Sequence, residues 1–167
     1  MTSRVRHLRP RPVNADLFAP FGELIEPAEI AAAMVNGQRF ERFDGLATVD
    51  CGDAPVNVGL MRCATATQLP CTIELVERHP LGSQAFLPLD AKPYVVAMAP
   101  PECDPETGAF EAFVVPPRIG INMRAGVWHV PLLGSSVGQT FAVIDRVGED
   151  NCDEHHLETL LVIQGSL

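Results

Sequence analysis

From Val56 to Val147 the sequence is a succession of short apolar segments, each interrupted by proline, glycine or aspartate. The segments are rich in β-branched and aromatic residues and recur at roughly 8–12-residue spacing, which is typical of antiparallel sandwiches and barrels. With 15 prolines and 13 glycines in 167 residues, the chain favours many short strands over long helices. Eight strands are expected, with the sequences VNVGLMRCA, CTIELVER, SQAFLPL, PYVVAMAP, FEAFVVPP, GINM, VWHVPLL and TFAVIDRV.

The region before these segments predicts one or two short helices. In NADLFAPFGELI, Asn14 and Asp16 are good helix caps and Pro20 ends the helix, so we expect a single turn followed by a strand from Glu23 to Ile25. The stretch AEIAAAMVNG predicts a second short helix that ends at Asn36-Gly37.

We expect one mainly β domain that spans residues 1–167, because soluble domains usually contain about 100–150 residues. Residues 1–12, which contain four arginines, are expected to be a solvated basic arm. Residues 156–167 are expected to be a C-terminal tail, with His155 and His156 in its acidic, solvated beginning.

The composition argues against several classes of function. A net charge of −9 disfavours a nucleic-acid partner, which requires clustered cations. The longest apolar run, Val95 to Pro101, is far shorter than the roughly 20 residues of a membrane span. Glycine-rich nucleotide-binding motifs are absent, so no nucleotide cofactor is expected. Five cysteines without a C-x-x-C pair predict neither disulfides nor a thiolate zinc site and suit a reducing cytoplasm.

Polar residues occupy positions that the strand pattern assigns to the interior. In TIELVERH, Ile73, Leu75, Glu77 and His79 share one face, and the two apolar residues mark the core side. Glu77 and His79 therefore continue the inward face towards the end of the strand, where an unpaired carboxylate is costly. After the turn PLGS, Gln84 begins the next strand and can lie across the hairpin from them.

A second imidazole, His129, lies among apolar residues in GVWHVPLL. Together with Glu77, His79 and Gln84 it predicts a pocket that opens at one end of the β domain. Arg62 follows apolar strand residues and could hold an anion in the same cavity through two parallel hydrogen bonds.

Three segments carry a resemblance to a known family. LVERHPLGSQAFLPL, GVWHVPLL and VIDRVGEDNCDEH, in this order and spacing, closely resemble ureidoglycolate lyases (also called ureidoglycolate hydrolases). FAPFGELIE and MVNGQRFERFDGLATVD match more loosely, and the resemblance covers roughly Val13 to His155. It implies a cupin-like β-barrel, a homodimer, and cleavage of ureidoglycolate to glyoxylate and urea in allantoin degradation. A nickel-stimulated activity is also implied.

The resemblance places the site residues as well. Glu77, His79 and Gln84 fall where cupins carry the ligands of their first motif, and His129 falls at the histidine of the second. We expect His79 or Glu77 to be the base at the substrate hydroxyl, and His129 to orient the substrate or supply a proton. Either Arg62 or Arg124 is expected to hold the substrate carboxylate. The same four residues could bind a divalent metal such as nickel, zinc or iron.

The sequence departs from the family pattern at several positions. Met123, Arg124, Ala125 and Val130 stand where the family usually has Tyr, His, Arg and a second His, and Asp44 replaces a histidine after Arg42-Phe43. Two alternatives therefore remain open. The first is a lyase or hydrolase that acts on a related small hydroxy or ureido acid. The second is a cupin-like binding protein without catalytic activity.

Overall fold

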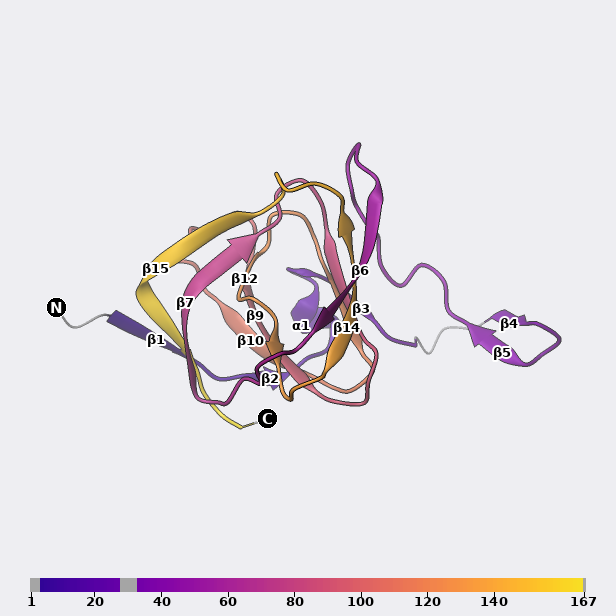
Figure 1. Cartoon of the computed structure of the whole chain (residues 1–167), viewed down its shortest axis with the longest axis horizontal. Coiled ribbons are helices and arrows are strands. Elements are labelled where there is room, and N and C mark those ends of the chain that lie inside the picture. Colours follow the sequence, from indigo (N-terminus) through magenta and orange to yellow (C-terminus); the bar gives the residue numbers. More distant parts are fainter. Residues whose placement is uncertain (1–3, 28–32, 167) are drawn as a thin grey trace.

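Two curled β-sheets face each other and form a cupin-like barrel in the computed structural model, which describes residues 4–27 and 33–166 (Figure 1). One sheet has the strand order β1-β15-β7-β12-β9-β10-β2, with β13 also paired to β9. The other has the order β3-β11-β8-β14-β6. The mainly β, cupin-like fold expected from the sequence is confirmed.

The elements of the first sheet are β1 (Arg4–Leu8), β2 (Arg11–Pro12), β7 (Cys71–Arg78), β9 (Tyr94–Ala99), β10 (Glu111–Val115), β12 (Trp128–His129), β13 (Leu133–Gly134) and β15 (Asp153–Ile163). Those of the second are β3 (Gly22–Ile25), β6 (Val56–Arg62), β8 (Gln84–Pro88), β11 (Gly120–Met123) and β14 (Thr140–Arg146). One helix, α1 (Ala15–Phe18), and a separate hairpin of β4 (Ala33–Val35) and β5 (Phe40–Arg42) complete the elements of the described residues.

All eight strands expected between Val56 and Val147 are present, as β6 to β12 and β14. The single helical turn is also confirmed, because the side chain of Asn14 caps α1 by accepting a hydrogen bond from the backbone N–H of Leu17 at 2.9 Å. Residues 100–110, between β9 and β10, contain no strand.

Most strands pair antiparallel, as expected, but the N-terminal strands do not. β1 runs parallel to β15, and β2 runs parallel to β10. Because β15 and β10 lie towards opposite ends of the same sheet, residues 4–12 supply the outermost strand at both of its edges.

Two apolar clusters form the core, one on each face of the large sheet. The first lies between the sheets and is dominated by aromatic rings, among which Tyr94 and Phe141 pack edge to face with their centroids 5.0 Å apart. The second lies on the other face of the large sheet, beneath β15. Val76, expected to point away from the core, is fully buried there, and Ile73 packs against the same cluster. The large sheet therefore buries both of its faces near β7.

Three expectations about the chain ends and the second helix are wrong. Residues 33–35 of the expected helix form β4, and residues 28–32 lie outside the described residues. The basic arm contains β1 and β2 from residue 4 onwards. The expected tail is the second half of β15, the longest strand. Its pairing with β7 shifts register between His156 and Leu161, so its side chains do not alternate regularly and the sequence pattern is obscured.

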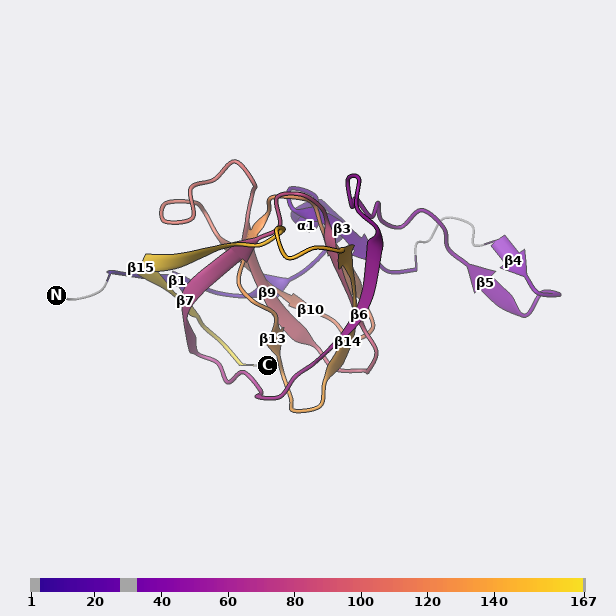
Figure 2. The ribbon, with the colours of Figure 1, turned by 45° about the horizontal axis from the view of Figure 1, so that its top comes forward.

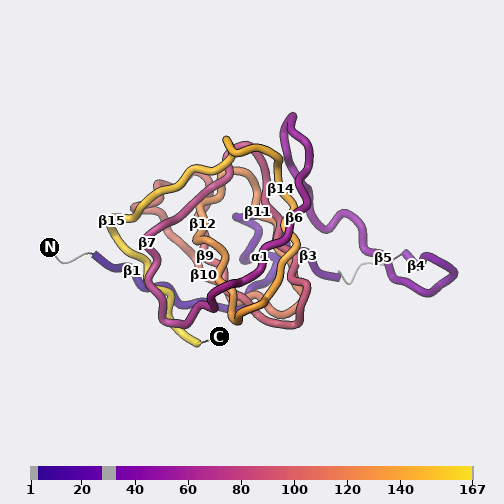
Figure 3. The backbone as a smooth tube through the Cα atoms, in the orientation of Figure 1, coloured from indigo at the N-terminus to yellow at the C-terminus, as the bar shows by residue number. Residues whose placement is uncertain are grey.

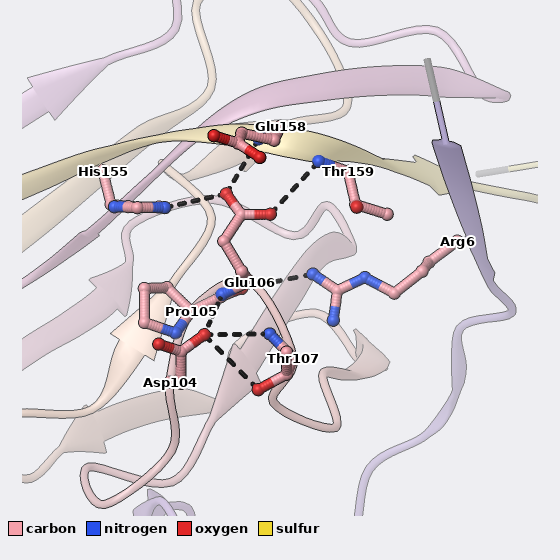
Figure 4. Close-up of polar contacts among 8 residues, drawn as sticks. All are labelled: Arg6, Asp104, Pro105, Glu106, Thr107, His155, Glu158 and Thr159. Carbon is pink, nitrogen blue, oxygen red and sulfur yellow. Dashed lines mark hydrogen bonds and ion pairs between the residues drawn. The ribbon is translucent and has the colours of Figure 1, made fainter. Parts of the chain in front are cut away.

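The irregularity in β15 is held by one carboxylate from the loop between β9 and β10 (Figure 4). Glu106 accepts hydrogen bonds from the backbone N–H groups of Glu158 at 2.8 Å and Thr159 at 3.1 Å, and its Oε1 lies 2.8 Å from Nε2 of His155. Arg6 of β1 donates to the carbonyls of Gly108 and Pro105 in the same loop. His155 is therefore a structural contact and not part of a solvated end.

Glu106→Gln should lower the free energy of unfolding by about 1–3 kcal/mol, because a neutral amide cannot accept all of these hydrogen bonds as a carboxylate does. The control is Glu102→Gln, at an exposed glutamate of the same loop. Denaturant unfolding followed by circular dichroism measures both variants. Equal midpoints for the two variants would contradict this role of Glu106.

The same contact predicts a pH dependence. Burial alone would raise the pKa of the Glu106 carboxyl, but the hydrogen bonds from Glu158, His155 and Thr159 together lower it below the ordinary value of 4.5. A lowered folded-state pKa gives stability that is complete above pH 4.5 and is lost as the pH falls through the lowered value. The stability gap between wild type and Glu106→Gln should therefore narrow in acid.

The β4–β5 hairpin projects away from the barrel (Figure 1, Figure 2). It exposes Met34 and Phe40, whose exposed fractions are 44% and 60%.

Within the described residues, no helix is long and apolar enough to cross a membrane.

Candidate active site

The site forms where β7 and β12 lie side by side, between β15 and β9 (Figure 3). Glu77 and His129 are a register pair of these antiparallel strands. Nε2 of His129 lies 3.4 Å from Oε1 of Glu77. His129 is 3% exposed, and the Glu77 side chain is 23% exposed, so the pair reaches solvent through the carboxylate.

His79 follows directly after β7 and completes the group. Its ring lies 5.2 Å from the ring of His129, centroid to centroid. Its Nδ1 lies 2.5 Å from the backbone carbonyl of Asn151, and the Asn151 side chain accepts from the backbone N–H of Leu81 at 2.7 Å. The loop after β14 therefore fixes both the His79 ring and the turn that leads into β8.

Both imidazoles are held in the same tautomer. Nδ1 of His129 lies 2.9 Å from the carbonyl of Val127, as Nδ1 of His79 lies near that of Asn151. A carbonyl only accepts, so each Nδ1 must carry a proton, and in the neutral ring Nε2 then bears the lone pair. Neither Nε2 atom has a hydrogen-bond partner within the described residues, although both are buried.

The site therefore brings together two imidazole nitrogens whose lone pairs accept no hydrogen bond within the described residues. Ligand atoms of Glu77, His79 and His129 all lie within 4.8 Å of one another. Such an arrangement is stable only if a proton or a cation lies between the atoms. Two imidazole nitrogens and a carboxylate oxygen are also a donor set that divalent transition metals accept, so these residues are compatible with a metal.

The electrostatics of Glu77 describe the site with a proton between Glu77 and His129. The hydrogen bond and the charge from His129 lower the pKa of the Glu77 carboxyl, with a smaller contribution from the charge of His79, and together outweigh the rise that burial causes. Glu77 is therefore ionised at neutral pH.

A second group of potential ligands, formed by Glu77, Cys152 and Glu154, lies on the exposed side of the carboxylate.

Gln84 begins β8 and lies on the same inner face as Phe86, which belongs to the core between the sheets. It is 8% exposed, and its Nε2 donates to Oδ2 of Asp145 on β14 at 3.2 Å. Its Oε1 is buried and has no hydrogen-bond partner among the described residues. Five residues separate the end of β7 from Gln84, so Gln84 lies at the same end of the barrel as Glu77.

Neither arginine expected to hold an anion is placed to do so. Arg62 pairs with Thr140, whereas Asp145 lies five residues further along β14, roughly 17 Å away at the rise of a strand. Arg62 is exposed there and lines a different cavity, with Cys63 and Phe141. Arg124 lies nearer, because Gly126 of its turn donates to the His79 carbonyl, but its guanidinium donates to the carbonyl of Ala19.

Sequence reasoning missed Asp145. Its neighbour Arg146 pairs with Asp53 and Asp150. The pattern that identified Glu77 also applies to TFAVIDRV, because Phe141 and Val143 are buried and Asp145 continues their face. No sequence pattern predicts the role of Asn151, because its backbone carbonyl makes the contact with Nδ1 of His79.

Comparisons with known proteins identify the family of the chain. The sequence profile of the family described as ureidoglycolate lyase matches residues 5–164. A ureidoglycolate lyase of Pseudomonas fluorescens (strain Pf0-1) is 42% identical over 154 residues, which are 90% of this chain and 92% of that protein. One of Pseudomonas entomophila is 38% identical over 164 residues, covering 95% and 98% of the two chains. The chain belongs to the ureidoglycolate lyase family.

Proposed function

We propose that this protein cleaves ureidoglycolate to glyoxylate and urea, as a lyase of allantoin degradation. Family membership across nearly the whole chain supports this activity. The observation that carries the proposal is the meeting of His129 with Glu77 and His79, about 50 residues earlier in the chain, with ligand atoms of all three within 4.8 Å of one another.

The reaction needs two proton transfers. The hydroxyl proton leaves as its oxygen becomes the aldehyde of glyoxylate, the C–N bond breaks, and the nitrogen of the departing urea takes a proton. His79 is suited to accept the first proton, because its Nδ1–H is tied to Asn151 and its Nε2 has no hydrogen-bond partner among the described residues. We assign the second transfer to a proton shared by Glu77 and His129, whose Oε1 and Nε2 atoms lie 3.4 Å apart. Glu77 in the role of base remains the alternative.

The substrate is an anion, whereas the protein has a net charge of −9 and the site itself carries a carboxylate. Arg124, released from Ala19, is the arginine that would have to hold the substrate carboxylate. In an alternative form of the site, a divalent metal held by Glu77, His79 and His129 would take the lone pairs that otherwise handle protons, and would supply positive charge that polarises the substrate oxygens. Nickel is the ion that we propose.

His79→Ala and His129→Ala should each lower kcat for urea release by about 10²–10⁴-fold, because each removes a group that handles a proton. His156→Ala, at an exposed histidine of β15, is the matched control and should keep wild-type turnover. Coupled assays of urea and glyoxylate measure the rates, and circular dichroism verifies folding. Folded variants with wild-type kcat would contradict the assignment of His79 and His129 to proton transfer. Saturable ureidoglycolate binding without any turnover by wild type would favour a binding protein instead.

The metal proposal can be tested without activity. Titration calorimetry with Ni²⁺ should show one site, and His79→Ala should weaken binding by at least about tenfold. Cys152→Ser removes a ligand of the exposed group only and should leave the affinity unchanged. The opposite ranking of the two variants would place the ion at the exposed group, and no binding by wild type would exclude a nickel site.

We also propose that the chain forms a homodimer through β6. This strand ends the order of the smaller sheet, so its outer edge has no partner strand within the described residues. Alternate residues Val56, Val58 and Leu60 form an apolar stripe, with exposed fractions of 54%, 74% and 68%. A second copy that pairs with this strand would cover the stripe.

Val58→Lys should convert the dimer to a monomer, because a charge at the centre of the stripe would be desolvated. Val137→Lys, at an equally exposed valine outside β6, is the matched control. Light scattering coupled to gel filtration measures the mass. A dimeric Val58→Lys variant, or a monomeric wild type, would refute this interface.

We further propose a cytoplasmic location. All five cysteines are free thiols, which supports a reducing compartment.

A further inference from the structure

The orientation of the Gln84 carboxamide is set by Asp145. Ile144 of β14 pairs with Ala85 of β8, so Gln84 and Asp145 are the next residues along the two strands. Their side chains meet on the inner face, where Nε2 of Gln84 donates to Oδ2 of Asp145 at 3.2 Å. The other oxygen of Asp145 accepts from Nδ2 of Asn57 at 2.8 Å.

Only one orientation of the amide satisfies this contact. An ionised carboxylate accepts hydrogen bonds and cannot donate, so the NH₂ group of Gln84 must face Asp145 and its oxygen must face away. The rotated amide would place its oxygen against the Asp145 oxygen. The result is a buried Oε1 atom to which no group in residues 4–27 and 33–166 donates, on a residue that is 8% exposed.

A buried acceptor without a partner costs free energy until a ligand supplies a donor. The ureido group of ureidoglycolate has N–H donors, and Gln84 lies at the end of the barrel that holds Glu77 and His79. We propose that Asp145 is a positioning residue that turns the Gln84 oxygen towards the substrate, so that the site selects ligands with a ureido N–H. This inference rests on the proposed function, because it takes ureidoglycolate as the ligand.

Asp145 acts through Gln84 and does not contact the reacting atoms. The hydrogen bond to the ureido group is present in the ground state and in the transition state alike, so its loss should raise KM more than it lowers kcat. In Asp145→Asn the side-chain oxygen still accepts from Asn57, so the new NH₂ group faces Gln84 and favours the rotated amide, whose oxygen points away from the substrate. We expect this variant to raise KM by about three- to tenfold, the range of one ordinary hydrogen bond.

A double variant that keeps the total charge distinguishes positioning of the Gln84 side chain by Asp145 from structural support. In the double variant Asp145→Asn/Gln84→Glu, the asparagine donates to one oxygen of the new carboxylate, and the other oxygen faces the substrate whichever way the group rotates. Total charge is unchanged. We expect KM to return to within about threefold of wild type. Gln84→Glu alone places two carboxylates together and should bind substrate more weakly than the double variant.

Asp53→Asn is the matched control, because its side chain is 98% exposed, and it should leave KM unchanged. A double variant no better than Asp145→Asn, with all variants folded, would overturn the proposal. So would an Asp145→Asn variant with wild-type KM.

A second measurement is independent of activity. In ¹⁵N-labelled protein, the Gln84 side-chain NH₂ signals can be assigned by their loss in Gln84→Glu. We expect these protons to exchange slowly with water in wild type and faster in Asp145→Asn. Identical exchange in the two proteins would overturn the positioning role. If wild type released no urea but showed this dependence, the proposed function would fail while the orientation of Gln84 by Asp145 would stand.

Discussion

Glu77 and His129 meet because β7 and β12 pair antiparallel, with the two residues opposite each other and facing inwards. The neighbouring residues Arg78 and Trp128 stack on the other face, where the Arg78 guanidinium carbon lies 4.6 Å from the Trp128 ring centroid. A slip of one residue in this pairing would bring the stacked pair inside and the acid–imidazole pair outside. The packing of the second core, which includes Val76 and Trp128, therefore fixes the geometry of the site.

The site consists of acceptors whose donors are all used elsewhere. Backbone carbonyls take the Nδ1 protons of His79 and His129, and Asp145 takes the amide protons of Gln84. The acceptor atoms that face inwards have high affinity for protons, cations and N–H groups. This polarity is a property of the surrounding backbone as much as of the four side chains.

Alternation of residue types predicted the strands from Val56 to Val147 and the inward direction of Glu77 and His79, because regular strands between turns have a period of two. It failed for β15, whose charged first half and register shift break that period. It also failed for Arg62: the side-chain pattern is the same at both ends of a barrel, and only the strand pairing shows that Arg62 lies at the wrong one. Contacts made by backbone atoms, such as the Asn151 carbonyl, leave no pattern in the sequence.

The two parallel strands at the start of the chain cover both margins of the large sheet, although only two residues separate β1 from β2. A protease that cut between Leu8 and Arg11 would leave β1 held only by its non-covalent contacts with β15, while β2 would stay covalently joined to α1. Loss of β1 would uncover the row of backbone amides and carbonyls along β15, which is the kind of open strand edge that pairs with other chains.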